Sequence, residues 1–378
     1  MKSISLLEHI KTIKDFRLDR AKEHPLINIV AISITALLAG AGSWCQVAEF
    51  GEAKKEFLSL FLDLSSGIPS HDTFTRFFTL LDPKEFEKFF VSWTSSLKVI
   101  LPKEIISFDG KFIRRSKDVK KNIQPIVIVS AWANNAQLVL GQVATESKSN
   151  EIKALPILLD YLNIKGCIIT SDAMGCQKGT VKKIVEKGGD YVISLKGNQS
   201  RLHQSAIKYS DSELLKKDPK GITVKTTTDR GHGRIEERRY YTSNNISWLP
   251  GSCLWGNLQT ITAVESNRLI NGDLSTEKRY YISSLENIDD ISLAIRKHWG
   301  IENSLHWVLD TCFREDECRK RAGNSGINFN KVRHVALNLL KSEKSTKASM
   351  PTKRLKAGWD DSYMLKLLSQ FENNSHIS

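Results

Sequence analysis

The amino-acid sequence predicts an α/β protein in which a mixed β-sheet flanked by helices follows an all-helical N-terminal region. Three observations predict this fold class. Residues 1–98 carry apolar patterns typical of helices. After residue 104, short runs rich in Ile and Val alternate with helical stretches. Residues 221–284 then alternate between polar and apolar side chains, which indicates a strand-rich insertion before the last helices.

The N-terminal region contains two clear helical patterns, a strongly apolar one at Ile27–Leu38 and one of mixed charge at Val47–Leu62. After a Gly-Ile-Pro interruption, Ser70 suits the N-cap of a further helix. Two interpretations of this helix stay open. In the first, it is the recognition helix of a helix-turn-helix, with Thr73 and Arg76 directed toward DNA. In the second, its phenylalanines pack a helical bundle.

The middle of the chain predicts a sheet with helices between its strands. The strands share short apolar runs rich in Ile and Val, and we expect them at Ile105–Phe108, Pro125–Ala133, Leu138–Thr145, Cys167–Thr170 and Tyr191–Leu195. Helices are expected between the last three strands, at Ile152–Leu162 and Gln177–Lys187. Three strands, then helix, strand, helix and strand, form the order of a ribonuclease H-like core.

The C-terminal part predicts two more helices, from about Asp289 to Asp310 and from about Asn328 to Leu340. A basic, poorly periodic stretch follows. We therefore expect three regions: a helical N-terminal domain at 1–98, a catalytic domain at 99–345 that includes the insertion, and a basic tail at 346–378.

Composition points to a polyanionic partner. The 378 residues include 55 Lys and Arg against 42 Asp and Glu, a formal net charge of +13. Such a surplus favours nucleic acid. The N-terminus lacks a signal-peptide pattern, and the most apolar stretch is too short to span a bilayer, so we expect no membrane partner and a cytoplasmic, nucleoid-associated protein. Six scattered cysteines show no zinc-ligand spacing and are expected to be reduced thiols.

Three carboxylates stand where they could share a cleft. Asp109 and Asp172 each follow an apolar strand, and in the expected core these two strands are neighbours. Glu302 lies on the expected helix at 289–310. Converging carboxylates repel unless a divalent cation binds them, and hard oxygen ligands suit two Mg²⁺ or Mn²⁺ ions. Taken singly, each acid also fits an ordinary turn, helix cap or surface charge.

Several motifs resemble the DDE transposases of bacterial insertion sequences, in the subgroup of H-repeat-associated proteins. The matching motifs lie in consistent order along nearly the whole chain: GIPSHDTFTRFF at 67–78, SFDGKFIRRS at 107–116, TSDAMGCQK at 170–178, YVISLKGNQ at 191–199, GHGRIEERR at 231–239, HWGIENSLHWVLD at 298–310 and VRHVALNLL at 332–340.

The resemblance implies a ribonuclease H-like core whose catalytic and metal-binding triad falls on Asp109, Asp172 and Glu302. It implies a transposase that binds the inverted repeats of its own element, cleaves phosphodiesters with divalent metal and joins the 3′-hydroxyl ends to target DNA. A homodimer or larger synaptic complex is implied as well. A stand-alone nuclease, or a remnant that only binds DNA, are the alternatives.

One signature of related transposases is missing. Its Tyr, Arg and Lys positions around Glu302 correspond here to Ile295, His298 and Leu309. Trp299 and Trp307 could stack on an unpaired base, although we expect at least one of them in the core.

DNA contacts are expected from basic and polar side chains near the expected active site, in the insertion and in the basic C-terminal segment. From Phe313 to Lys356 there are twelve basic residues and four acidic ones, a segment that we expect to follow the DNA path leaving the active site. End recognition is expected from Ser70, Thr73 and Arg76. The other candidates are Lys196, His232, Arg234, Arg238, His298, Asn303, His306, Arg319, Arg321, Lys353 and Arg354.

Overall fold

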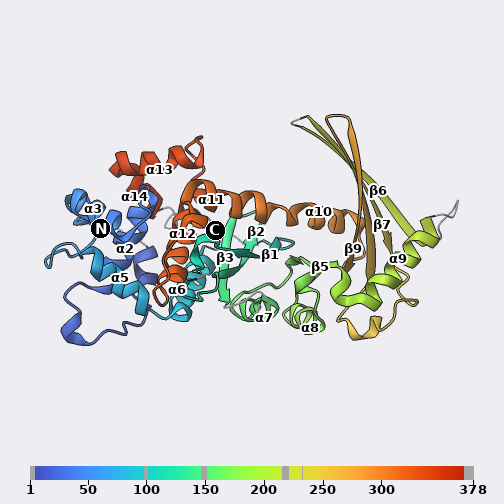
Figure 1. Ribbon diagram of the computed structural model, residues 1–378, viewed down its shortest axis with the longest axis horizontal. Coiled ribbons are helices and arrows are strands. Elements are labelled where there is room, and N and C mark those ends of the chain that lie inside the picture. The colour runs from blue at the N-terminus through green and yellow to red at the C-terminus, as the bar shows by residue number, and fades with distance from the viewer. Residues whose placement is uncertain are drawn as a thin grey trace, which may run out of the picture.

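The computed structural model describes residues 5–97, 101–118, 120–145, 151–214, 221–231 and 233–369. The molecule is elongated, with a helical part at one end, a sheet in the middle and a β-rich arm at the other end (Figure 1). This arrangement gives a mixed α/β protein, as the sequence predicts.

Helices make up the described secondary structure of the N-terminal region. They are α1 (Ser5–Ile10), α2 (Leu26–Leu38), α3 (Trp44–Ala53), α4 (Lys55–Leu58), α5 (His71–Leu80) and α6 (Pro83–Ser96). The single helix expected at 47–62 is wrong, because the chain breaks at Lys54 between α3 and α4. Phe57 and Leu58, which follow the break in α4, are both buried in the core.

Helix α5 begins as predicted. The Ser70 hydroxyl accepts a hydrogen bond from the backbone N–H of Thr73 at 3.3 Å, which makes Ser70 the N-cap. The phenylalanines of α5 are buried, and the Trp44 ring stacks on Phe78 with centroids 4.5 Å apart. They pack the helical core, as one of the two interpretations requires. A helix-turn-helix role for α5 stays a prediction.

The central sheet has nine strands in the order β3-β2-β1-β4-β5-β9-β8-β7-β6. Strands β2 and β3 are antiparallel to their neighbours, whereas β1, β4 and β5 run parallel. The first five strands and their helices are β1 (Ile105–Phe112), β2 (Val127–Ala133), β3 (Leu138–Thr145), α7 (Glu151–Tyr161), β4 (Ile168–Ser171), α8 (Lys178–Glu186), β5 (Asp190–Leu195) and α9 (Ser200–Leu214). All five strands therefore lie where the sequence predicts them.

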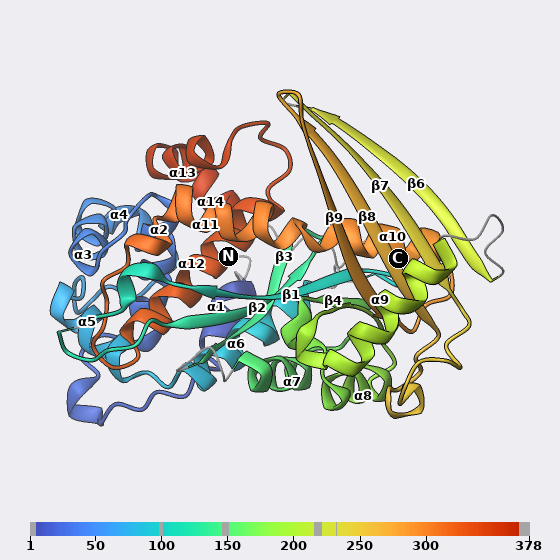
Figure 2. The ribbon, with the colours of Figure 1, turned by 45° about the vertical axis from the view of Figure 1, so that its right-hand side comes forward.

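The strand-rich insertion extends this sheet. Its strands, all antiparallel, are β6 (Ile222–Gly231), β7 (Arg234–Ser243), β8 (Thr260–Ile270) and β9 (Asp273–Ser283). Strand β9 pairs with β5, so the insertion is continuous with the central strands. Figure 2 shows the two hairpins reaching well beyond the body of the molecule.

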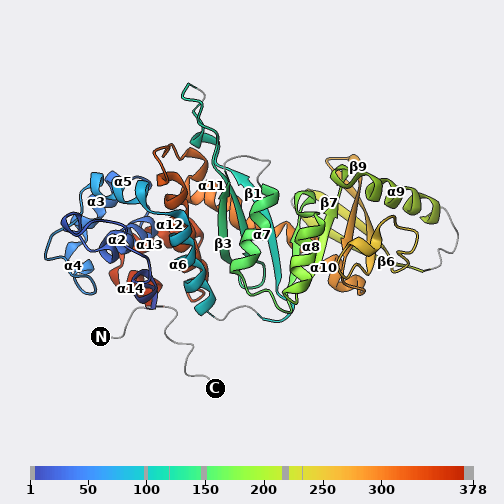
Figure 3. The same ribbon diagram turned by 90° about the horizontal axis from the view of Figure 1, so that it is seen from below.

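Helices cover both faces of the central strands, with α7 and α8 on one face and α10 (Ile288–His298) on the other (Figure 3). The helix expected at about 289–310 is confirmed in extent, but its winding changes in the middle. After α10 the chain winds into a π-helical segment at Glu302–His306 and resumes as α11 (Trp307–Phe313). Such π-segments occur mostly as single turns inside α-helices, frequently at functional sites.

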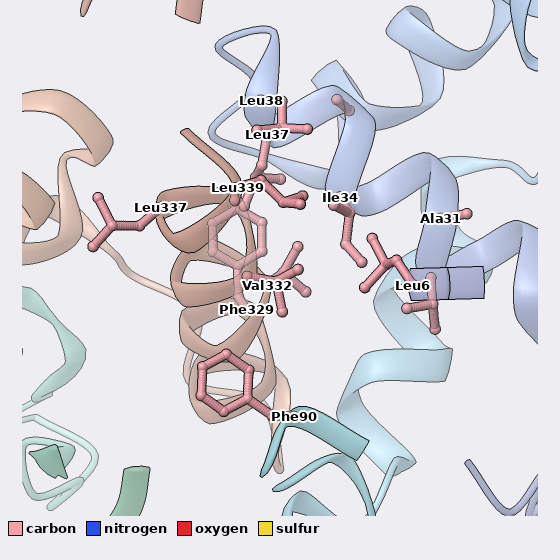
Figure 4. Close-up of a cluster of buried hydrophobic side chains, with 14 of the residues drawn as sticks. Leu6, Ala31, Ile34, Leu37, Leu38, Phe90, Phe329, Val332, Leu337 and Leu339 are labelled. Carbon is pink, nitrogen blue, oxygen red and sulfur yellow. The ribbon is translucent and has the colours of Figure 1, made fainter. Parts of the chain in front are cut away.

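The last helices close the molecule against its beginning. Helix α12 (Ser325–Ser342) is followed by α13 (Met350–Trp359) and α14 (Asp361–Ser369), so the expected tail is folded over most of its length. Residues of α12 and α14 share one apolar core with α1, α2 and α6. Figure 4 shows Phe329 and Val332 of α12 facing Leu6 and Ile34 across this core.

A buried ion pair lies beside that core. Lys331 of α12 contacts Glu87 of α6, and both side chains are almost fully inaccessible to solvent. A second oxygen of Glu87 accepts a hydrogen bond from the backbone N–H of Gln142 on β3 at 2.7 Å. The pair therefore ties the two helices to the edge of the sheet. Among the described helices, none has the length and apolar character needed to cross a membrane.

Candidate active site

Asp109 and Asp172 leave adjacent parallel strands at the same level. In the β1–β4 register, Phe108 pairs with Ser171, so the next residue on each strand is an aspartate. Side chains alternate along β1: Ile106 and Phe108 pack in the core under α7 and α8, which directs Asp109 toward the α10 face. The strand pairing expected from the sequence therefore brings these two carboxylates to one edge.

The Asp172 loop is held by hydrogen bonds. The Asp172 carboxylate accepts a hydrogen bond from the backbone N–H of Met174 at 3.0 Å. Asn198, after β5, donates to the carbonyl oxygen of Ala173 at 2.6 Å. Gly175 packs so tightly that a Cβ there would lie 2.2 Å from the Ser171 hydroxyl. These contacts fix the position of Asp172 relative to the end of β5.

Glu302 reaches the same edge from the π-helical segment. Its Oε2 lies 2.9 Å from Nδ1 of His306, which also lies 3.6 Å from Oδ2 of Asp109. The His306 ring is buried, whereas the Glu302 side chain is about half exposed. The spacing of four residues puts both side chains on one face, as the sequence predicts. His306 thus stands between two of the three acids.

Burial and charge repulsion oppose the ionisation of Asp109. Burial, together with the negative charges of Asp172 and Glu302, raises the Asp109 pKa to about 6, although His306 opposes the rise. Hydrogen bonding from His306 lowers the pKa of Glu302 below its ordinary value. The site thus contains carboxylates held against mutual repulsion, which is the electrostatic condition that a bound cation relieves.

The donor set fits a divalent cation. Asp109, Glu302 and His306 each offer a ligand atom, and these atoms all lie within 4.8 Å of one another. Asp172 and Glu302 line one cavity with Asp109. Carboxylate oxygens suit Mg²⁺ and Mn²⁺.

A polar network that the sequence did not predict lies under the acids. Nδ1 of His298 lies 3.0 Å from the Thr170 hydroxyl, which donates to the Ser107 hydroxyl at 2.9 Å. Asn134 donates to the same Ser107 oxygen at 2.8 Å. Ser107 precedes Asp109 by two residues, and Thr170 precedes Asp172 by two residues. Each hydroxyl therefore lies on the same face of the sheet as the aspartate that follows it. Burial lowers the pKa of His298 to about 4, which keeps the ring neutral.

His298 therefore does not provide the positive charge that its place in the family signature would suggest. A neutral ring joins α10 to β1 and β4. The signal in the sequence was the two-residue spacing of Ser107 and Thr170 before the acids, which marks a shared face.

The three acids open into a cavity of about 290 Å³ whose wall also carries basic and aromatic side chains. Lys196 is exposed at its edge. The Arg279 guanidinium lies 5.4 Å from the ring centre of Trp299. Trp299 is 43% exposed and Trp307 is 62% exposed, so the expectation that at least one packs in the core is wrong. The helix turns both rings outward because its apolar side is filled by Ile301, Leu305 and Val308.

A second ionic cluster anchors the helix that follows. Lys111, two residues after Asp109 on β1, contacts both Asp310 of α11 and Glu315, the latter at 2.7 Å. The Glu315 side chain is almost fully buried. This cluster therefore ties β1, which carries Asp109, to α11, which directly follows the turn that carries Glu302.

The insertion residues are split between exposed and internal positions. Arg234 is exposed near the tip of the β6–β7 hairpin, and Asn303 is exposed beside Glu302. Arg238 is largely buried and pairs with Asp229 and with Glu236 at 2.7 Å. Its role as a DNA contact stays a prediction, although in this structure its charge is already matched. His232 lies outside the described residues.

The expected basic path along 313–356 does not run as one exposed strip. Lys353 is buried and contacts the Glu343 carboxylate at 3.2 Å. Arg354 donates to the carbonyl oxygens of Cys312 and Leu37, the latter at 2.8 Å. These cations are internal because α13 folds against α2 and α11.

The other two cations of that segment are placed differently. Arg321 pairs with Asp118 at 3.2 Å. Arg319 is exposed and lines a separate cavity near α2 and α11. The N-terminal candidates are also apart from the acids: Thr73 is partly exposed and Arg76 is exposed on α5.

The family described as "Transposase DDE domain" matches residues 100–339, and the one described as "DDE_Tnp_1-associated" matches residues 7–94. The chain is 37% identical to the H repeat-associated protein YhhI of Escherichia coli (strain K12), over 96% of this chain and 97% of that protein. It is 39% identical to YncI of Escherichia coli O157:H7, over 97% of this chain and 94% of that protein.

Both relatives carry the word transposase in their names. Among solved structures, the piggyBac transposase synaptic complex with hairpin DNA superposes with a TM-score of 0.47 at 10% identity, over 99% of this chain and 80% of that one. The extent of the sequence matches decides the family: this chain belongs to the DDE transposases.

Proposed function

We propose that the protein is an active DNA transposase that cleaves phosphodiester bonds at the ends of its own insertion sequence and joins the freed 3′-hydroxyls to target DNA. The observation that supports this most directly is the single cavity lined by Asp109, Asp172 and Glu302. Membership of the DDE transposase family supports a joint catalytic role for these acids. The strand order β3-β2-β1-β4-β5 supports a ribonuclease H-like core for the same chemistry.

Each side chain has a role in this proposal. Asp109, Asp172 and Glu302 would hold two Mg²⁺ or Mn²⁺ ions, which activate the attacking hydroxyl and stabilise the leaving oxygen when bound. Lys196 and Arg279 line the same cavity and would contact the phosphate of the strand being cut. Trp299, exposed beside Arg279, would stack on a base next to the scissile bond.

His306 would orient Glu302. Its buried ring hydrogen-bonds one Glu302 oxygen at 2.9 Å, which restrains a carboxylate that is otherwise half exposed. The π-helical segment adds to this, because it sets the angular offset between Glu302 and His306 within a single turn.

The remaining parts of the proposal concern partners. The helical N-terminal region, through Ser70, Thr73 and Arg76 of α5, would bind the inverted repeats. Because two ends must be held at once, a homodimer or larger synaptic complex would perform the reaction, in the bacterial cytoplasm at the nucleoid. Exposed Arg234 and Asn303 would contact the DNA backbone.

The test combines purified protein, Mg²⁺ and duplex DNA that carries the element's own ends. Asp109→Asn, Asp172→Asn and Glu302→Gln should each abolish cleavage while leaving the fold intact by circular dichroism. The matched control is Glu186→Gln, an exposed acid on α8 outside the cavity. Full cleavage by any of the three variants would contradict the assigned triad. Cut DNA that is never joined to a target would instead favour a stand-alone nuclease.

A further inference from the structure

A second cavity, remote from the three acids, gathers positive charge. It encloses about 630 Å³ between the loop after α2, the end of α11 and the start of α13. Five cationic side chains line it, against the single carboxylate of Glu317: Arg314, Arg319, Lys320, Arg333 and Arg354. A cavity of this volume is within the range that binds small ligands.

These cations lack the counter-ions that other enclosed cations of the chain have. Lys111, Lys331 and Lys353 are buried or nearly so, and each contacts a carboxylate. Within the described part of the chain, none of the five cavity cations forms an ion pair. An unpaired buried cation is costly, so a group of them in one concave site requires an explanation.

Arg333 shows the imbalance most clearly. Its residue is only 3% exposed, and its Nη1 is buried with no hydrogen-bond partner in the described chain. Nε of Arg354 is buried and unpartnered in the same sense. An arginine cannot shed its proton, so these donors keep both charge and hydrogen-bonding capacity. Both residues line the cavity, so an anion that enters it would meet their positive charge.

Other contacts hold the cations in place before any ligand arrives. The Arg333 guanidinium lies 4.6 Å from the Phe329 ring centre, and the Lys320 ammonium lies 3.8 Å from the same ring. Lys320 also donates to the carbonyl oxygen of Gly42 at 3.2 Å. Burial lowers the pKa of Lys320 to about 8. The side chains are thus preorganised and electrostatically uncompensated.

We propose that this cavity is a phosphate-binding site, separate from the active site, in which Arg333 and Arg354 bind phosphate oxygens and Arg314 and Arg319 attract the anion from the rim. Arginine donors match phosphate geometry and bind it through charge-assisted hydrogen bonds. The phosphate could belong to a DNA strand or to a free nucleotide, and the experiment separates these two sources.

The position of the site is compatible with DNA. Cys312, which lines the cavity, follows Glu302 by ten residues along the same helix, roughly 15 Å at about 1.5 Å per residue. Along a duplex, one strand offers a phosphate about every 3.4 Å, so roughly four base pairs would span the interval. If the bound phosphate belongs to DNA, the inference rests on the proposed function. If the phosphate belongs to a free nucleotide, the inference is independent of the proposed function.

The first measurement is isothermal titration calorimetry of the full chain with inorganic pyrophosphate at low salt. Arg314→Gln combined with Arg319→Gln should weaken binding roughly threefold to tenfold, because both side chains are at the rim. Arg333→Met should weaken it at least tenfold. The matched control, Lys208→Gln on the exposed face of α9, should bind as the parent does.

Because Arg333 is buried, its variant could fail to fold, which circular dichroism would show. The rim double variant then carries the test, since its side chains are exposed. Failure of the parent to bind pyrophosphate, or equal binding by the folded rim variant, would overturn the proposal. Loss of DNA cleavage would not affect this readout, so failure of the proposed function is distinguishable.

The second measurement identifies the source of the phosphate. It follows the affinity for a DNA duplex by fluorescence anisotropy across salt concentrations. If the site binds the DNA backbone, the rim double variant should reduce the salt slope by about one to two units. If pyrophosphate binding falls while the DNA slope is unchanged, the site binds a free nucleotide. Both outcomes support a phosphate site.

Discussion

Replacing Asp109 by Asn should stabilise the metal-free protein. In the folded chain, burial and the nearby carboxylates raise the Asp109 pKa to about 6, from 3.8 in the absence of these effects. Above that pH the folded protein holds a charge that its surroundings disfavour. An amide of the same shape removes the charge, so the variant should be more stable although we expect it to be inactive.

The magnitude follows from the shift. A pKa raised from 3.8 to about 6 corresponds to about 3 kcal/mol of unfolding free energy. Between the unfolded and folded pKa values the folded state binds more protons, so stability falls as pH rises through this window. The full cost is present above about pH 7 and disappears below about pH 4. At pH 5 the gain from Asp109→Asn should be about half of its value at pH 8.

Urea denaturation in EDTA, followed by circular dichroism at pH 5 and pH 8, measures the difference directly. Any pH-independent effect of the amide cancels when the two differences are compared. Glu186→Gln is the control, since its exposed carboxyl lies on α8 outside the cavity. A difference that is equal at both pH values would refute the raised pKa. Added Mg²⁺ should stabilise the parent protein and not the variant.

Three further predictions concern stability, each measured by urea denaturation. Lys331→Met leaves Glu87 buried without its cation and should lower the free energy of unfolding by about 3–5 kcal/mol. Adding Glu87→Gln should recover much of this loss, and additive losses in the double variant would refute the coupling. Ser70→Ala removes a helix cap and should cost about 1 kcal/mol, against no loss for Ser70→Asp. Lys353→Met should cost several kcal/mol because the side chain is buried against a carboxylate, whereas Lys356→Gln should change stability by less than about 1 kcal/mol; equal effects would place Lys353 at the surface.

Strong local signals made much of the fold predictable. The Ile- and Val-rich runs before Asp109 and Asp172 are buried strands in any packing, and their order fixed which ones would be neighbours. Ser70 was predictable as a cap because its hydroxyl satisfies a backbone N–H that every helix start exposes. The convergence of the two aspartates followed from these strands and their order.

The rest depends on contacts between distant segments. The π-helical turn at Glu302 cannot be read from periodicity, because a single extra residue per turn is lost in a short apolar pattern. Lys331 is buried against Glu87, which is distant in sequence, and Lys353 is buried against Glu343, which lies on the other side of a turn. Neither contact can be inferred from composition, which predicts both lysines at the surface. Both tryptophans beside Glu302 were misjudged for the same reason, since their exposure is decided by neighbouring side chains.

The shared core of the first and last helices has a consequence for the timing of synthesis. Helix α2 is made early, but α12, against which it packs, begins about 290 residues later. At translation rates of about 5–20 residues per second, α2 therefore waits roughly 15 to 60 s on the ribosome without its partner. Its apolar surface is a candidate for chaperone binding during that interval. A messenger cut short before α12 would yield a chain whose N-terminal region lacks part of its core.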